Sequence, residues 1–340
     1  MPMGGNQVTI KDIAREAGVS TALVSFVMSN HSAGESVYRV NKETAKRVME
    51  VAERLQYKPN SSARALRSGK TGTIGVVLSD IANPFFAEIA RYLEDHAYRY
   101  GYNVIFASTD ENPEKVRRVI DVLLNKGVDG LIIVPCEGSA DVIREVVDAG
   151  INTVLLDRQV PGLEVSSVVL DNRDASRQLT EILLSRGARH IEMVSYAMDI
   201  SNAREREQGY VDAMEAAGLQ TGMHIQKIAH NNYSGIAVYV KDAKARGVDG
   251  FVVATNTLTS LVLSEVMRNG WRIPSDFQLA CFDRNPLYDV YTSGIVYARQ
   301  PIGTFAEKAM DIIMSHVRSV GDKAPAAETV VLSPEIRETI

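Results

Sequence analysis

Polar side chains follow several apolar stretches of this sequence, each at the point where a predicted strand ends. Asp and Arg come directly after "TVLL", Asp follows "LACF" and Asn follows "VVAT". Planar aromatic rings combined with amide, carboxylate and guanidinium groups suit a ring that carries several hydroxyl groups, because the aromatic rings bury its CH faces while the polar groups pair with the hydroxyls. The candidate set is Asn83, Phe85, Phe86, Asp157, Arg158, Arg206, Asn256, Asp283 and Gln300.

These side chains need a scaffold that brings the ends of several strands together. From Thr73 onward, short apolar strands alternate with amphipathic helices, which are predicted at 84–99, 113–126, 140–149, 174–186, 204–217, 257–269 and 303–317. Repeated βαβ units with almost continuously apolar strands indicate parallel sheets covered by helices on both faces, and two runs of strands indicate two similar lobes. Ligands of such folds bind at the carboxyl ends of the strands. Any single one of the nine candidate residues could instead cap a helix or pack in the core. The prediction of a binding cleft therefore rests on all nine residues together.

A second candidate surface lies near the N-terminus, in "IKDIAREAG" and "VSTALVSFVMSN". Apolar residues at i, i+3, i+4 and i+7 spacing predict two short helices joined at Gly18, with Ser20 as the cap of the second. This is the pattern of a helix–turn–helix, whose second helix reads the major groove of DNA. The outward face of that helix is almost entirely small and uncharged: Thr21, Ala22, Ser25, Phe26 and Ser29.

A third helix is predicted to begin after Asn41. The segment that follows this helix contains both a helix-breaking residue and a short stretch that could be helical. Residues 57–72 begin with a helix breaker, Pro59, and contain "SSARALRS", which is too short to be stable as an isolated helix. Two interpretations stay open for this segment. It is either a plain linker or a hinge helix that orders only on DNA.

The charge is unevenly distributed along the 340 residues. Residues 1–70 carry 11 Lys and Arg against 6 Asp and Glu, although the whole chain carries 37 against 42. A basic N-terminal part on an acidic body indicates a nucleic-acid contact at one end only. The start of the sequence has no apolar segment of signal-peptide length, and no apolar run reaches the ~18 residues of a membrane span. We therefore expect a cytoplasmic protein of two or three domains with no membrane contact.

The sequence lacks the motifs of common catalysts. It contains no G-x-G-x-x-G, G-x-S-x-G, H-E-x-x-H or C-x-x-C, and "SGKTG" fails as a phosphate-binding loop because Arg64 stands where the first Gly is required. The six His residues have no metal-ligand spacing. Cys136 and Cys281 lie in apolar contexts and are expected to be buried thiols. We therefore predict no catalytic residues, no metal site and no cofactor.

The motifs together resemble one family over almost the whole chain. Residues 8–68 resemble the DNA-binding headpiece of the lactose/galactose repressor (LacI/GalR) family of bacterial transcription regulators, through "VTIKDIAREAGVS", "VSFVMSN", "ETAKRVMEVAERLQYKPN" and "ARALRSGKTGTIGVV". The remainder is similar to the effector core of that family and to periplasmic ribose-type binding proteins, through "NPFFAEI", "GVDGLIIVP", "LLDR", "REQGY", "ATN", "CFD" and "RQP".

The resemblance implies roles for individual residues. All nine candidate cleft residues fall on positions that hold a sugar in the ribose-type relatives, so the implied effector is a monosaccharide. Thr21 and Ala22 occupy the main base-reading positions, while Ser20 and Ser25 occupy phosphate-contacting ones. Phe26 stands where most members have Arg, and it either contacts a thymine methyl or folds back on the headpiece. The DNA-binding set also includes Ser29, Asn60 and Leu66, the last as the hinge residue that wedges into the minor groove.

The expected organisation is an α/β protein in three parts: a helix–turn–helix domain at 8–56, a hinge with a short helix at 57–72, and a two-lobed core at 73–340. The N-lobe is expected at about 73–171 and 297–325, and the C-lobe at 172–296 and 326–340. The predicted function is a homodimeric regulator, expected to be a repressor, that binds a pseudo-palindromic operator under the control of the effector. A sugar-binding transport component is the alternative, and an enzyme on a doubly wound scaffold is a second one.

Overall fold

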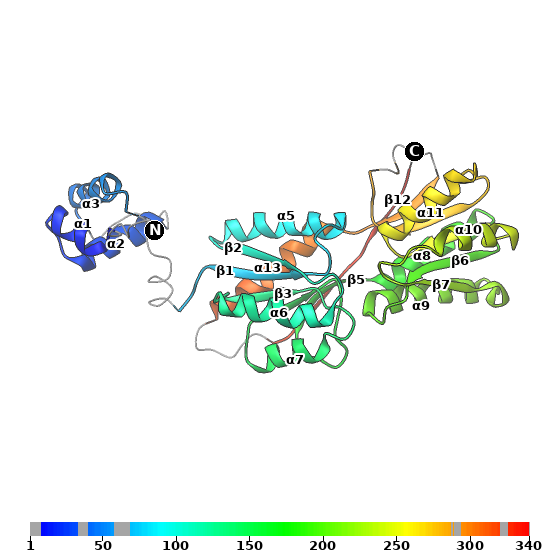
Figure 1. The fold of residues 1–340 in the computed structure, drawn as a ribbon, viewed down its shortest axis with the longest axis horizontal. Coiled ribbons are helices and arrows are strands. Elements are labelled where there is room, and N and C mark those ends of the chain that lie inside the picture. The colour runs from blue at the N-terminus through cyan, green and yellow to red at the C-terminus, as the bar shows by residue number, and fades with distance from the viewer. Residues whose placement is uncertain are drawn as a thin grey trace, which may run out of the picture. The chain divides into compact units, whose positions relative to one another are not determined.

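The computed structural model describes residues 8–32, 40–57, 69–286, 288, 294–319 and 326–339. The chain forms two compact units, which divide between Thr71 and Gly72. The first unit is a small group of helices, and the second contains two sheets with helices on both faces (Figure 1). These architectures confirm the predicted α/β fold class.

The N-terminal unit contains α1 (Ile10–Ala17), α2 (Thr21–Ser32) and α3 (Lys42–Arg54). Gly18 ends α1 with a φ of 65°, in the left-handed region that a side chain would disfavour. Ile13, Val24 and Val48, one from each helix, are fully buried against one another. The predicted helix–turn–helix is therefore confirmed, with a core built from the apolar stripe of each helix.

The first sheet of the core is six-stranded, in the order β11-β5-β4-β3-β1-β2, and all its described pairs are parallel. Its strands are β1 (Thr73–Leu78), β2 (Asn103–Ser108), β3 (Gly130–Ile133), β4 (Thr153–Leu156), β5 (Ser166–Leu170) and β11 (Thr329–Leu332). Its helices are α5 (Pro84–Arg99), α6 (Pro113–Asn125), α7 (Ala140–Asp148) and α13 (Ile302–Arg318). Helices α5 and α13 pack against each other on one face, while α6 and α7 cover the other. We call this half of the core the N-lobe.

The second sheet repeats that order of strands, as β12-β10-β9-β8-β6-β7. Its strands are β6 (Ile191–Tyr196), β7 (His224–Ile228), β8 (Gly250–Val253), β9 (Gln278–Phe282), β10 (Ile295–Arg299) and β12 (Glu335–Glu338), the last antiparallel to β10. Its helices are α8 (Asn172–Ser185), α9 (Ser201–Ala216), α10 (Ile236–Ala245) and α11 (Asn256–Arg268), with a short 3₁₀ turn at Gln220–Gly222. Helices α8 and α9 pack on one face, and α10 and α11 pack on the other. This half is the C-lobe.

The chain crosses between the lobes three times. It leaves the N-lobe after β5, returns between β10 and α13, and leaves again between β11 and β12. The backbone N–H of Asp171, in the first crossing, donates to the Leu332 carbonyl at 2.8 Å and ties two of the crossings together.

The expected lobe boundaries near the C-terminus are wrong in two places. Residues 326–332 were assigned to the C-lobe, but β11 pairs in parallel with β5 of the N-lobe, with Thr329 opposite Ser167. Residues 297–299 were assigned to the N-lobe, but they belong to β10 in the C-lobe sheet. The edge of β5 needs a partner for its backbone groups, and the first part of the C-terminal segment supplies it.

Two elements were also missed, β7 and α10. Strand β7 is an edge strand with mostly polar residues, and α10 begins with branched apolar residues that do not show a clear helical stripe. The predicted hinge at 57–72, including Asn60 and Leu66, lies largely outside the described residues. No helix among the described residues is long and apolar enough to cross a membrane.

Candidate functional site

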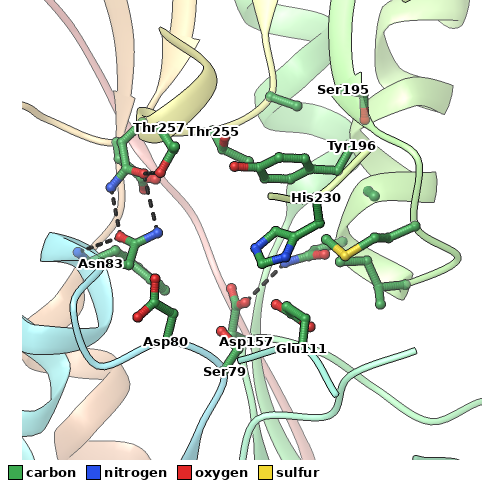
Figure 2. A pocket seen from close by; sticks show the side chains of 18 of the residues that line it. Ser79, Asp80, Asn83, Glu111, Asp157, Ser195, Tyr196, His230, Thr255 and Thr257 are labelled. Carbon is green, nitrogen blue, oxygen red and sulfur yellow. Dashed lines mark hydrogen bonds between the residues drawn. The ribbon is translucent and has the colours of Figure 1, made fainter. Parts of the chain in front are cut away.

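A cavity of about 110 Å³ lies between the lobes, at the carboxyl ends of the strands of both sheets (Figure 2). Residues that follow eight of the described strands line it, together with residues from the N-terminal parts of α5, α9 and α11. All nine residues singled out from the sequence are among them: Asn83, Phe85, Phe86, Asp157, Arg158, Arg206, Asn256, Asp283 and Gln300. The structure therefore brings the whole predicted set together in one place.

Asp157 and Asp283 occupy corresponding positions in the two lobes, directly after β4 and β9. Both have left-handed backbones, with φ of 66° and 70°, a conformation that is uncommon for residues other than Gly and is concentrated at functional sites. Asp283 Oδ1 accepts a hydrogen bond from Gln300 Nε2 at 2.7 Å. Asp157 Oδ2 accepts one from Asn202 Nδ2 at 3.0 Å, while its Oδ1 is buried without a partner. Burial raises the pKa of both carboxyl groups because it disfavours the charged form.

Arg158 is held by the protein itself. Its two terminal nitrogens donate to the Glu111 carboxylate at 2.7 and 2.8 Å, and one of them also donates to the Pro135 carbonyl at 2.9 Å. The Arg158 and Glu111 side chains are each only 7% exposed. Burial lowers the pKa of Arg158, but the Glu111 carboxylate raises it, and the net shift is upward. Only Nε stays without a hydrogen bond, at 3.4 Å from Asp157 Oδ2, so Arg158 acts mainly by shaping the wall of the cavity.

Arg206 lies on α9 and is the second buried cation of the cavity. Its Nε donates to Asn172 Oδ1 at 2.7 Å, and one terminal nitrogen donates to the Ala254 carbonyl at 2.6 Å. The guanidinium carbon stacks 3.9 Å from the centre of the Phe282 ring. Burial lowers the pKa of Arg206, while Asp283 and Asp157 act in the opposite direction. Arg204, two residues earlier, instead pairs with Asp199 at the exposed surface.

Two side-chain contacts join the lobes across the cavity. Asn256 Nδ2, from α11 of the C-lobe, donates to Asn83 Oδ1 at 2.9 Å, and Asn83 also caps α5 by accepting from the Phe85 N–H at 3.0 Å. The cap of α11 is Thr255, not Asn256, so the Asn256 amide is available to the other lobe. The second contact is the Asp157–Asn202 hydrogen bond. A ligand in the cavity can therefore act on groups that also hold the lobes together.

Phe85 and Phe86 both line the cavity and both pack into the hydrophobic core. Their ring centres lie 5.0 Å apart with an interplanar angle of 70°, an edge-to-face pair. Both rings of the predicted set therefore line the cavity. Their faces give the cavity an apolar surface beside its polar groups.

The sequence reasoning missed a second group of cavity residues. These are Ser79, Asp80, Glu111, Ser195, Tyr196, Met198, Ile200, Asn202, Ala203, His230, Asn231, Tyr233, Ala254, Thr255 and Thr257. Tyr196 and His230 form an edge-to-face pair with ring centres 5.4 Å apart, and the Tyr196 and Tyr233 hydroxyls lie 3.5 Å from each other. Burial raises the pKa of Tyr196. Because β7 was not predicted, the loop that carries His230 and Tyr233 could not be placed.

The DNA-reading candidates are found on α2 of the N-terminal unit. Ser20 caps this helix, since its Oγ accepts from the Leu23 N–H at 3.2 Å. Thr21 and Ala22 are exposed, and Ser25 is half-buried. Phe26 is 38% exposed and lies outside the hydrophobic core of the unit, so it is not folded back into that core. The side chain of Ser29, together with Asn60 and Leu66, lies outside the described residues.

The described residues provide neither a metal site nor a reactive thiol. No group of three or more His, Cys, Asp and Glu side chains there is placed to hold a metal ion. Cys136 and Cys281 are both free and buried, as expected, and burial raises the pKa of the Cys136 thiol to about 11. Neither thiol is prepared to act as a nucleophile, because the thiolate is the reactive form.

Comparisons with known proteins agree with both units. Residues 9–60 match the family model "Bacterial regulatory proteins, lacI family", residues 71–228 match "Periplasmic binding proteins and sugar binding domain of LacI family", and residues 180–340 match "Periplasmic binding protein-like domain". The HTH-type transcriptional regulator RegA of Clostridium saccharobutylicum is 30% identical over 312 residues, which cover 90% of this chain and 91% of RegA.

Two solved structures show the same fold. The lac repressor dimer bound to operator and the anti-inducer ONPF has a TM-score of 0.82 at 19% identity, covering 98% of this chain and 99% of that one. A periplasmic binding protein/LacI transcriptional regulator from Alkaliphilus metalliredigens, complexed with D-xylulofuranose, has a TM-score of 0.69 at 21% identity and covers 79% of this chain and 98% of that one. The resemblance seen in the sequence motifs is thus confirmed, and the chain belongs to the LacI family of DNA-binding transcriptional regulators.

Proposed function

We propose that this regulator is a repressor whose affinity for operator DNA is controlled by a monosaccharide bound between the two lobes of the core. The observation that carries the proposal is the composition of the cavity. Carboxylate, amide and guanidinium groups from both lobes converge beside two aromatic rings, which is the combination that a polyhydroxylated ring requires. The fold neighbour with bound D-xylulofuranose supports an unphosphorylated sugar as the ligand class.

The mechanism follows from the position of the cavity. A sugar that bonds to Arg206 and Asp283 of the C-lobe and to Asp157 of the N-lobe stabilises one relative arrangement of the lobes. Such a ligand shifts the population of arrangements by its difference in affinity for them, typically ~1–3 kcal/mol. The shift reaches DNA through the segment that joins the core to the N-terminal unit, and Leu66 in this segment is our candidate for the residue that wedges into the minor groove.

On the DNA side, we propose a homodimer that places one helix–turn–helix unit in each half-site of a pseudo-palindromic operator. Thr21 and Ala22 are exposed at the start of α2, where base edges are read, while Ser20, Ser25, Ser29 and Asn60 are our candidates for contacts with phosphates or bases. Phe26 cannot make the bidentate contact with guanine that Arg makes, but its exposed ring suits a thymine methyl group.

The first experiment recovers the operator by selecting random duplexes with the full-length protein and with its Phe26→Arg variant. We expect a palindromic consensus, and we expect the variant to change the preferred base pair at one symmetric position, toward G·C. An unchanged consensus would show that Phe26 reads nothing. Failure to select any common sequence would overturn the role in operator recognition.

The second experiment measures operator binding by fluorescence anisotropy while pentoses and hexoses are titrated in. One unphosphorylated monosaccharide should change the dissociation constant for the operator by about tenfold or more, and the direction shows whether the sugar acts as inducer or co-repressor. Arg206→Gln should abolish this response, since it removes a buried donor, whereas the matched control Arg204→Gln should keep it, since that side chain pairs at the surface. If only sugar phosphates or nucleobases act, or if both variants respond equally, the assignment of the effector is wrong.

A further inference from the structure

The carboxylates of the cavity outnumber its guanidinium groups. Asp80, Glu111, Asp157 and Asp283 line it, against Arg158 and Arg206. The Glu111 carboxylate accepts hydrogen bonds from both terminal nitrogens of Arg158, so Glu111 and Arg158 neutralise each other. The cavity therefore has two carboxylates more than it has permanent cations.

The excess lies on the N-lobe side. Asp80 follows β1, Glu111 follows β2 and Asp157 follows β4, and in Figure 2 the three carboxylates project into the same side of the cavity. Asp80 takes part in no ion pair with another described residue, and its only described partner is the Ala82 N–H at 2.8 Å. Asp157 is 3% exposed, and its Oδ1 has no hydrogen-bond partner. Arg158 Nε lies 3.4 Å from Asp157 Oδ2, but Asp157 Oδ1 stays without a partner, and the half-buried Asp80 has no described cation beside it. A buried carboxylate oxygen without a donor is costly, so this side of the cavity suits a donor or a cation.

The opposite wall is aromatic. Tyr196, at the end of β6, and His230, after β7, face the N-lobe carboxylates from the C-lobe (Figure 2). Tyr233, also after β7, lines the cavity as well. The face of an aromatic ring attracts a cation, and its apolar surface covers the CH groups of a sugar. A metal ion does not fit, because no three described His, Cys, Asp or Glu side chains are placed to coordinate one. A phosphate does not fit either, because it would add negative charge beside Asp80 and Asp157.

We propose that the effector is an amino sugar, whose protonated amine lies among the N-lobe carboxylates and whose hydroxyls face Asn256, Asp283 and Gln300. This inference rests on the proposed sugar-binding function and narrows it to one charge class. The ammonium group supplies a positive charge beside Asp80 and a hydrogen-bond donor for Asp157 Oδ1. The neutral parent sugar fills the same space without supplying the charge.

The test measures dissociation constants by calorimetry with the full-length protein. The probes are glucose, galactose and mannose, their 2-amino-2-deoxy and 6-amino-6-deoxy forms, and the N-acetyl derivatives of these amines. One amino form should bind about tenfold or more tightly than its parent hexose, the size of one charge-assisted hydrogen bond, and N-acetylation should remove the gain. Asp80→Asn should reduce the preference for the amine over the parent to within about threefold, while the exposed Asp121→Asn control should leave the preference intact.

The possible results distinguish failure of the amino-sugar inference from failure of the proposed sugar-binding function. A parent hexose that binds as tightly as its amine, or a preference that survives both Asp80→Asn and Asp157→Asn, overturns the amino-sugar inference and leaves the sugar-binding function standing. If no hexose, amino hexose or N-acetyl derivative binds, the amino-sugar inference fails, and the pentoses of the operator-binding experiment decide whether the sugar-binding function stands. The preference is a ratio of two constants on one protein, so a variant of lower stability still gives a valid result. Should Asp80→Asn fail to fold, Asp157→Asn supplies the same ratio from the neighbouring carboxylate.

Discussion

The two lobes repeat one arrangement of strands, and at the same point of each sheet the chain reads Asp-Arg. In the N-lobe this is Asp157 and Arg158 after β4, and in the C-lobe it is Asp283 and Arg284 after β9. Both Asp residues have the same left-handed backbone and both line the cavity. The two Arg residues differ, since Arg158 is buried with Glu111 whereas Arg284 is exposed.

The difference shows how a nearly symmetric frame produces an asymmetric site. The C-lobe fills the space near its Asp with Arg206 from α9, while the N-lobe uses its own Arg to neutralise Glu111 and leaves Asp80 and Asp157 facing the ligand. A ligand therefore meets negative charge on one side and a cation on the other. The fold fixes where the side chains lie, and a few substitutions at equivalent positions fix which way a ligand is oriented.

The largest change in unfolding free energy is expected from replacing the Arg of the N-lobe pair, compared with its counterpart in the C-lobe. Arg158→Ala removes the partner of the buried Glu111 carboxylate, and breaking a buried pair on one side costs about 3–5 kcal/mol of unfolding free energy. Arg284→Ala, at an exposed position, should stay within about 0.5 kcal/mol. Urea unfolding followed by the fluorescence of the single Trp271 measures both. Equal losses in the two variants would break the comparison between the lobes.

A smaller change in unfolding free energy, which depends on pH, is expected from replacing Asp157 or Asp283. Burial raises the pKa of both carboxyl groups, so the folded state holds their protons more strongly than the unfolded state does. The wild-type protein then loses stability as pH rises from the usual Asp pKa through the raised value, and an Asn at either position removes this loss.

At pH 7 we expect Asp157→Asn to raise the unfolding free energy by about 1 kcal/mol, because its Oδ1 lacks a partner, and Asp283→Asn to raise it by less. Urea unfolding at several pH values checks the prediction, and the advantage of both variants should shrink toward pH 4. A variant that is less stable than the wild type at pH 7, with no dependence on pH, would show that the carboxylate is well compensated in the folded state.

The smallest changes in unfolding free energy are expected from replacing Asn83 and Asn256, which lie at the starts of α5 and α11 and contact each other across the cavity. Asn83 both caps α5 and bonds to Asn256, whereas Asn256 bonds to Asn83 and to the Thr257 hydroxyl but caps no helix, because Thr255 caps α11. Asn83→Ala should cost about 1 kcal/mol, and Asn83→Ser, which keeps a capping oxygen, only a few tenths. Asn256→Ala should cost about 0.5 kcal/mol. If Asn83→Ser costs as much as Asn83→Ala, the inter-lobe hydrogen bond outweighs the cap.

The helix–turn–helix and the cleft residues could be predicted from the sequence because each depends on residue patterns within a short stretch of the chain. The helix–turn–helix depends on Gly18, the Ser20 cap and short apolar stripes. Eight of the nine cleft residues directly follow a strand or lie at the start of a helix, and Arg206 is the exception, within α9. Parallel strands place their carboxyl ends together, so finding the strand ends finds the cavity.

What could not be predicted depends on contacts between distant segments. Glu111 gives no local sign that it pairs with Arg158, 47 residues away, and the edge strand β7 has too few apolar residues to be recognised. The assignment of β11 to the N-lobe follows only from the open edge of β5. Long-range pairing of this kind is set by which backbone groups remain to be satisfied, and that is a property of the assembled sheet.

The position of β11 has a consequence for synthesis at the ribosome. The N-lobe begins at β1, near the start of the core, but its edge strand β11 and its covering helix α13 are encoded after almost all of the C-lobe. Until those residues emerge, β5 presents an unpaired edge, and the apolar face that α13 covers stays open to water and to other chains. A nascent chain that stalls before residue 302 therefore exposes both this strand edge and this apolar face, which are the surfaces that favour aggregation of incompletely folded chains.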